Sequence, residues 1–150
     1  MGINSKYFNL NEFLISQEAI RFGIQNIPDK RAIENIQWLC TKILDPLREK
    51  IGKPIVISSG YRSPELNKKI GGAQFPPSQH TMGKAADIIV PGISAKQLMD
   101  FIITQTTLPF DQLILEYLSW CHISYDRDKV QQRGEKLLIN QGTGYVPYKG

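Results

Sequence analysis

The chain is poor in cysteine and histidine, with two of each among 150 residues, and it has no long apolar run free of charge. Two cysteines, Cys40 and Cys121, are too few for a disulfide scaffold, so stability must come from a packed core, and a reduced cytosolic origin is the simplest interpretation. No apolar run reaches the roughly 18 residues that cross a bilayer, and we expect no stable membrane insertion. The first residues lack the basic stretch and apolar core of a secretory signal, which predicts a protein that is cytoplasmic when made.

Positively charged residues are in small excess. The chain has 18 Lys and Arg against 14 Asp and Glu, a net charge of +4. A nucleic-acid binder would carry a clustered basic stripe, and none is present, so we expect no nucleic-acid partner, while an anionic substrate stays open. With 41% hydrophobic residues, 12 Gly and 9 Pro, the composition excludes a disordered, collagenous or coiled-coil chain. The length fits one domain over residues 1–150, which we expect to be monomeric.

Helix signals recur along the chain. Apolar residues at three- and four-residue steps predict a helix over residues 29–51, with a kink or restart at Pro46. A shorter helix begins after Ser16 and ends at Gly23. Ser63-Pro64 opens another, which ends before residues 71–72, and Ser94 caps a fourth.

Strand signals lie between and after these helices. Residues 54–58 predict a buried strand and residues 86–90 a second one, with residues 73–83 as loop between them. Residues 112–116 and 120–124 predict a hairpin, and residues 136–139 an edge strand. The order favours an α+β fold, a small mixed or antiparallel sheet with helices packed on it. Residues 126–150 are left open as a lid or a frayed tail.

The two histidines and one aspartate stand out chemically. Asp87 directly precedes an apolar strand, where burial would require a partner or a metal, although it could also cap the strand end in water. His80 lies in the turn before it. His122 lies mid-strand on the opposite face from Cys121, which we interpret as a small core residue. Two histidines, one aspartate and a water would form a tetrahedral zinc site with an open position, as in hydrolytic zinc enzymes.

A zinc hydrolase also needs a base. Glu116 closes a strand six residues before His122, across the predicted hairpin, and the alternative is an edge glutamate facing solvent. Asp111 and Asp126 are fallback bases. Arg62 leaves the strand at residues 54–58 and could bind a substrate carboxylate or polarise a carbonyl, or could be an ordinary surface arginine.

These residues form an extended set of motifs, which comprises Ser59-Gly60-Tyr61-Arg62-Ser63, Asn67, Gly71-Gly72, Ser78, His80, Gly83, Ala85, Asp87, Glu116 and Trp120-Cys121-His122. In this set the chain resembles the zinc D-alanyl-D-alanine carboxypeptidase and L-alanyl-D-glutamate endopeptidase family, which shares its fold with Hedgehog signalling domains. The resemblance implies that His80, Asp87 and His122 bind one zinc ion and that Glu116 is the base. It also implies that Arg62 and Ser78 hold the substrate, with Trp120 beside them where many relatives have a further histidine.

The resemblance leads to a functional prediction. We expect a zinc metallopeptidase that hydrolyses a peptide bond in bacterial peptidoglycan stem peptides, as a D,D-carboxypeptidase or as an L-Ala-D-Glu endopeptidase; the sequence leaves that choice open. The short chain resembles phage or prophage endolysins, which reach the cell wall after release from the cytoplasm. The alternative is a noncatalytic zinc-binding domain in cell-wall binding or in a phage structure.

Overall fold

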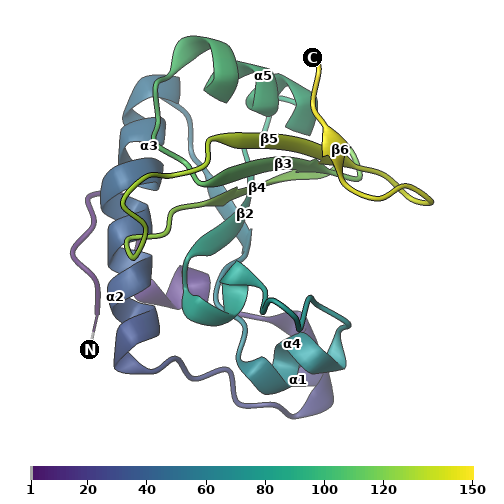
Figure 1. Ribbon diagram of the computed structural model, residues 1–150. Coiled ribbons are helices and arrows are strands. Elements are labelled where there is room, and N and C mark those ends of the chain that lie inside the picture. The colour runs from purple at the N-terminus through teal and green to yellow at the C-terminus, as the bar shows by residue number, and fades with distance from the viewer. Residues whose placement is uncertain (1) are drawn as a thin grey trace.

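The computed structural model describes residues 2–150 and has a mixed sheet with helices around it (Figure 1). The sheet has six strands in the order β1-β2-β4-β3-β5-β6, and only the β3–β5 pair is parallel. The predicted α+β fold with a mixed sheet is therefore confirmed. The strands are β1 (Val56–Ser59), β2 (Ala85–Ile89), β3 (Gln112–Glu116), β4 (Trp120–Ser124), β5 (Glu135–Ile139) and β6 (Val146–Pro147).

One long helical segment runs beside the sheet (Figure 1). It consists of α2 (Lys30–Leu39), a π-helical turn η2 (Cys40–Leu44) and α3 (Asp45–Ile51). The predicted restart at Pro46 is present: after a wider π turn, in which the Asp45 N–H donates to the Cys40 carbonyl five residues back, α3 begins with Pro46 in its first turn. Proline has no N–H to donate, and in a regular α-helix its ring clashes with the carbonyl four residues before it. A π turn just before the proline accommodates both the missing donor and the ring.

Two short helices lie together away from the sheet (Figure 1). They are α1 (Gln17–Phe22), capped by Ser16 and ended by Gly23 at φ 65°, and α4 (Pro64–Lys69), capped by Ser63. These caps and stops are as predicted. The side chain of Asn26 joins the segments, because its amide donates to the carbonyls of Leu14 and Tyr61 and its oxygen accepts from the Ser63 N–H.

The core lies between the long helical segment, α5 (Ala95–Gln105) and one face of the sheet. Both cysteines belong to it and are fully buried, which confirms their interpretation as core residues. The predicted Ser94 capping box at the start of α5 is present. No helix among residues 2–150 combines the length and the apolar character that crossing a bilayer requires. Core side chains from these elements include Ile36, Leu39, Ile43, Leu47, Ile88, Leu98, Leu113, Cys121 and Ile123.

The structure corrects two predictions around β1 and the following loop. Strand β1 is an edge strand, not a buried one: it pairs only with β2, and Val56 keeps 45% of its surface exposed. Residues 73–83 are not all loop, because Ser78 caps a 3-10 turn, η3 (Gln79–Met82). This turn carries His80.

The C-terminal segment is neither an edge strand alone nor a frayed tail. Strand β5 pairs in parallel with β3 and in antiparallel orientation with β6, so it lies inside the sheet. The Tyr148 N–H donates to the Lys136 carbonyl and holds the end of the chain against β5. Contacts far apart in sequence decide this arrangement, which is why local strand signals underestimated it.

Candidate metal centre and cleft

Three elements bring His80, Asp87 and His122 together. Asp87 on β2 is the antiparallel partner of His122 on β4, so the two side chains lie next to each other on one face of the sheet. Gly83, at φ 74°, ends η3 and turns the chain against α2, where a Cβ would lie 2.4 Å from the Ala32 carbonyl oxygen. All three side chains are buried, and the alternative in which Asp87 caps a strand end in water is wrong.

The three facing atoms form a nearly equilateral triangle. His80 Nε2 lies 3.2 Å from His122 Nδ1, and Asp87 Oδ1 lies 3.3 Å from each of these nitrogens. In a tetrahedral site with bonds of about 2.0–2.1 Å, any two ligands are about 3.3–3.4 Å apart. Asp87 Oδ1 is buried and has no hydrogen-bond partner among the described residues, a state that costs free energy unless an ion satisfies it. The donor set and spacing therefore fit a tetrahedral metal ion.

Backbone contacts orient the first histidine. The Nδ1 of His80 lies 2.7 Å from the Gly60 carbonyl oxygen. Since a carbonyl can only accept, Nδ1 carries the hydrogen and Nε2 presents its lone pair to the triangle. The His80 carbonyl in turn accepts from the Arg62 N–H, so the turn after β1 and η3 hold each other in place.

Glu116 stands beside this triangle, at the end of β3. Its Oε2 lies 3.8 Å from His122 Nδ1, and its Oε1 accepts a hydrogen bond of 3.2 Å from the Trp120 indole across the hairpin. Burial and the nearby Asp87 charge raise the pKa of Glu116, although the His122 charge opposes them. The side chain is turned toward the cluster and not to solvent, so the alternative of an edge glutamate facing water does not hold.

Arg62 and Ser78 meet on the other side of the site. Arg62 Nη2 donates to Ser78 Oγ at 3.0 Å, and this oxygen also accepts from the His80 N–H. Burial lowers the pKa of Arg62, opposed by the charges of Asp87 and Glu116. Its Nε–H is buried and has no acceptor among the described residues, so the guanidinium keeps a donor for a ligand.

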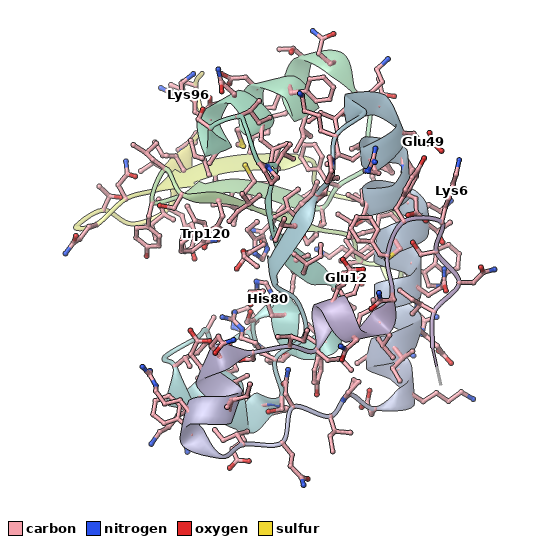
Figure 2. All side chains as sticks on the ribbon, turned by 180° about the vertical axis from the view of Figure 1, so that it is seen from behind. Lys6, Glu12, Glu49, His80, Lys96 and Trp120 are labelled. Atoms are coloured by element: carbon pink, nitrogen blue, oxygen red, sulfur yellow. The ribbon has the colours of Figure 1, made fainter. Side chains whose placement is uncertain are left out.

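A two-part cleft passes over the cluster. We call the half along β1, of about 650 Å³, the β1 part; Glu12, Glu18 and Val56 are among its lining residues. The half of about 660 Å³ that Ala73, His80, Glu116 and Tyr145 help to line is the loop part. Both parts share Arg62, Ile70, Asp87 and Trp120, so they adjoin beside the cluster residue Asp87. In Figure 2, Trp120 under the strands and His80 near the centre lie beside the same opening.

Sequence reasoning missed the aromatic lining of the loop part. Tyr117 and Tyr145 line it, 46% and 59% exposed, together with Phe75, which is 98% exposed. Tyr117 and Leu118 form the hairpin turn with φ of 56° and 54°, a conformation for which the usual signal is Gly or Asn. Tyr145 follows β5 by a turn whose position depends on distant strand pairing. No local signal could have placed it near the cluster.

Both fallback bases are engaged elsewhere. The fully buried Asp111 accepts from Arg133 and Lys129 at 2.7 and 2.9 Å, and Asp126 pairs with Lys84 at 2.8 Å. Neither aspartate lines the cleft. Their ion pairs stabilise the fold, and the suggestion that they serve as bases is wrong.

The comparison with protein families agrees with this geometry. A family model described as Peptidase M15 matches residues 6–124, more than three quarters of the chain. The chain belongs to this family of metallopeptidases. Comparison with curated proteins gives no match. The match spans the cluster from Arg62 to His122 and ends before β5 and β6, so Tyr145 lies outside the matched region.

Proposed function

We propose that the chain is a zinc-dependent peptidase that hydrolyses a peptide bond in the stem peptides of bacterial peptidoglycan. The observation that carries the proposal is the triangle of His80 Nε2, Asp87 Oδ1 and His122 Nδ1, with sides of 3.2–3.3 Å, beside a buried glutamate. Three protein ligands leave one position of a tetrahedral ion open, the pattern of catalytic and not of structural zinc sites.

The three side chains of the triangle would hold one zinc ion. When bound, zinc supplies a Lewis acid for the scissile carbonyl and lowers the pKa of a bound water to about 7. His80 is fixed for this role by the Gly60 carbonyl, and Asp87 by its place opposite His122 in the sheet. The two imidazoles beside Asp87 overcome the effect of burial and hold its pKa well below its usual range, so it presents a carboxylate.

Glu116 is the proton carrier in this proposal. Its Oε2 faces the cluster and would take a proton from the attacking water, then deliver it to the leaving amine. The Trp120 indole holds the other oxygen, which fixes the side-chain orientation without consuming Oε2. The raised pKa of Glu116 suits a group that must both accept and donate a proton near neutral pH.

Arg62 would bind the substrate at the junction of the two cleft parts. Its free Nε–H can donate to a substrate carbonyl or carboxylate, and its Nη2 is held by Ser78. Ser78 therefore acts mainly by placing Arg62 and capping η3. Trp120 lines both parts and offers an apolar surface to the substrate.

Family membership and the earlier resemblance support peptidoglycan as the substrate. We further propose that residues 1–150 act as one domain and as a monomer. In this proposal the protein is made in the cytoplasm and works on the wall after release, as phage or prophage endolysins do.

The test is mass spectrometry of purified stem peptides and of whole peptidoglycan after incubation with the zinc-loaded protein. Glu116→Gln should lower the rate by about 10²–10⁴-fold, as expected for loss of a general base, and still bind one zinc ion. Removal of zinc by a chelator should abolish the products, and zinc should restore them. Glu49→Gln is the matched control, because Glu49 pairs with Lys6 on the surface and the same change there should leave the rate unchanged.

The possible results distinguish a peptidase from a noncatalytic zinc-binding domain. Products lost in the Glu116→Gln variant and in the chelated protein would establish the peptidase and name the bond. About one zinc ion per chain without any product would instead support the noncatalytic zinc-binding domain. Full activity of Glu116→Gln would show that Glu116 is not the general base.

A further inference from the structure

Four residues that line the loop part carry a buried side-chain polar atom with no hydrogen-bond partner among residues 2–150; they are Arg62, Gln79, Asp87 and His122. The proposed zinc ion accounts for Asp87 Oδ1, and the proposed substrate contact accounts for Arg62 Nε–H. Gln79 Oε1 and His122 Nε2 are left without a partner. An unpaired buried polar atom costs free energy, so we looked for a contact that satisfies both.

The side-chain amide of Gln79 has one possible orientation. One of its ends lies 3.0 Å from Asp111 Oδ2. The Asp111 carboxylate is paired with Arg133 and Lys129, so it is ionised and can only accept hydrogen bonds. The NH₂ end of Gln79 therefore faces Asp111, and Oε1 is turned away from it. Gln79 thus holds a buried acceptor in a fixed position.

The second ring nitrogen of His122 is a donor. Its Nδ1 lies 3.2 Å from His80 Nε2 and 3.3 Å from Asp87 Oδ1, where its lone pair would bind zinc. The hydrogen of the neutral ring then lies on Nε2. Histidines that bind a metal donate this second N–H to a carboxylate, a carbonyl or a water, which fixes the ring orientation. The Gly60 carbonyl does this for His80, whereas no protein atom among residues 2–150 does it for His122.

The fold places the Gln79 amide close to His122. At one end Gln79 adjoins His80, whose ring centroid lies 5.0 Å from that of His122. At the other end its amide binds Asp111, and the Asp111 N–H donates to the carbonyl of Ser124, two residues after His122 on β4. Two residues of a strand span about 7 Å and their side chains share a face. One water molecule with hydrogen bonds of about 2.8 Å bridges about 5–6 Å, which suits this separation.

We propose that Gln79 is a positioning residue for the metal ligand His122: its Oε1 accepts the Nε2–H through one bridging water, while Asp111 holds its NH₂ group. This inference rests on the zinc site of the proposed function and adds what orients its third ligand. Arg133 and Lys129 hold Asp111 in turn, and both lie beyond the residues that the family model matches. The segment before β5 is thereby connected to the metal centre.

The first test is the zinc Kd, measured by competition with a chromogenic chelator. Gln79→Met keeps the length of the side chain and removes both amide contacts. The Kd should rise about 10–100-fold, as when the hydrogen-bond partner of a metal-bound histidine is removed.

Gln112→Met is the matched control. Gln112 is also half-buried, lines the loop part and donates to a carboxylate, that of Glu135 at 2.7 Å, but its oxygen is not among the buried unpaired atoms. The zinc Kd of this variant should stay within about twofold of the native value.

The second test detects the hydrogen bond by proton–nitrogen correlation NMR of the zinc-loaded protein. The native protein should show the imidazole N–H signals of both His80 and His122, because both are buried and bonded. In Gln79→Met the His122 signal should be lost through faster exchange with water. The His80 signal should remain, because the Gly60 carbonyl that binds it does not depend on Gln79.

Three results would overturn the inference. The first is an unchanged zinc Kd with both imidazole signals retained. The second is loss of both signals, which would show that Gln79 only keeps η3 in place. The third is a higher KM at an unchanged zinc Kd, which would assign Gln79 Oε1 to the substrate. All three leave the proposed function standing, since that fails only if the native protein binds no zinc or gives no product.

Discussion

The buried ion cluster at Asp111 offers a quantitative test of how the C-terminal segment is attached. The Asp111 carboxylate is fully buried and receives the side chains of Arg133, Lys129 and Gln79 and the Arg133 backbone N–H, at 2.7–3.2 Å. Gln79 comes from η3, next to His80, whereas Arg133 and Lys129 precede β5. One carboxylate thus joins β3, η3 and the approach to β5.

Replacing Asp111 with Asn removes the charge and keeps the size. Breaking a buried ion pair costs about 3–5 kcal/mol when the remaining charge stays buried. Here Arg133 and Lys129 keep side-chain exposures of 45% and 35%, so water can solvate them in the variant. We therefore expect a loss of about 2–3 kcal/mol in the free energy of unfolding. For a chain of this length that corresponds to a melting temperature about 5–10 °C lower.

The loss should also depend on pH. Burial opposes ionisation of Asp111, but the hydrogen bonds and charge of Arg133 and the Lys129 ammonium lower its pKa well below the usual range. A depressed folded-state pKa adds stability above the unfolded value of about 3.9, and that stability is lost as the pH falls through the folded value. The difference in melting temperature between the native protein and Asp111→Asn should therefore be largest at pH 7, and it should begin to shrink as the pH falls below about 4.

Thermal unfolding followed by circular dichroism at pH 7 and pH 3 measures both effects. Glu49→Gln is the control, because its ion pair with Lys6 is solvent-exposed and should contribute no resolvable shift. A change below about 2 °C at pH 7, or an undiminished difference at pH 3, would refute the reasoning.

Three further predictions follow from single features. Gly83→Ala should lose at least about 2 kcal/mol, because its Cβ would lie 2.4 Å from the Ala32 carbonyl at a φ of 74°, whereas Gly134→Ala, at φ 63° with open space, should lose only about 1 kcal/mol; urea unfolding compares them. Cys40 and Cys121 should react with a thiol reagent only after unfolding, since burial raises the pKa of each to about 12; rapid labelling of the native protein would contradict this. Zinc at about 100 times its Kd should raise the free energy of unfolding of the metal-free protein by about 2.7 kcal/mol, and His80→Ala should abolish this increase. An equal increase in that variant would exclude His80 as a ligand.

Local signals in the sequence predicted most of the elements correctly. The caps at Ser16, Ser63 and Ser94, the stop at Gly23 and the hairpin of β3 and β4 all lie where the pattern placed them. These features depend on hydrogen bonds and side-chain periodicity within a few residues, so neighbouring letters are sufficient. The same periodicity placed His122 on the face opposite Cys121, as the sheet has it.

Tertiary structure decided what depends on distant partners. Strand β1 became an edge because no strand among residues 2–150 pairs with its outer side. From the sequence alone Asp111 was a possible base, but in the fold its carboxylate forms ion pairs with Arg133 and Lys129 from the C-terminal segment.

The candidate site shows both kinds of determination. Its residue types and their order along the chain are present in the sequence, and the anomaly of Asp87 beside an apolar strand pointed to a buried partner. The spacing of 3.2–3.3 Å, the Gly60 carbonyl that orients His80 and the cleft on both sides exist only once β1, β2, β4 and η3 are packed together. Residue chemistry is a property of the chain, whereas distances between segments 20 to 42 residues apart are set by sheet register and core packing.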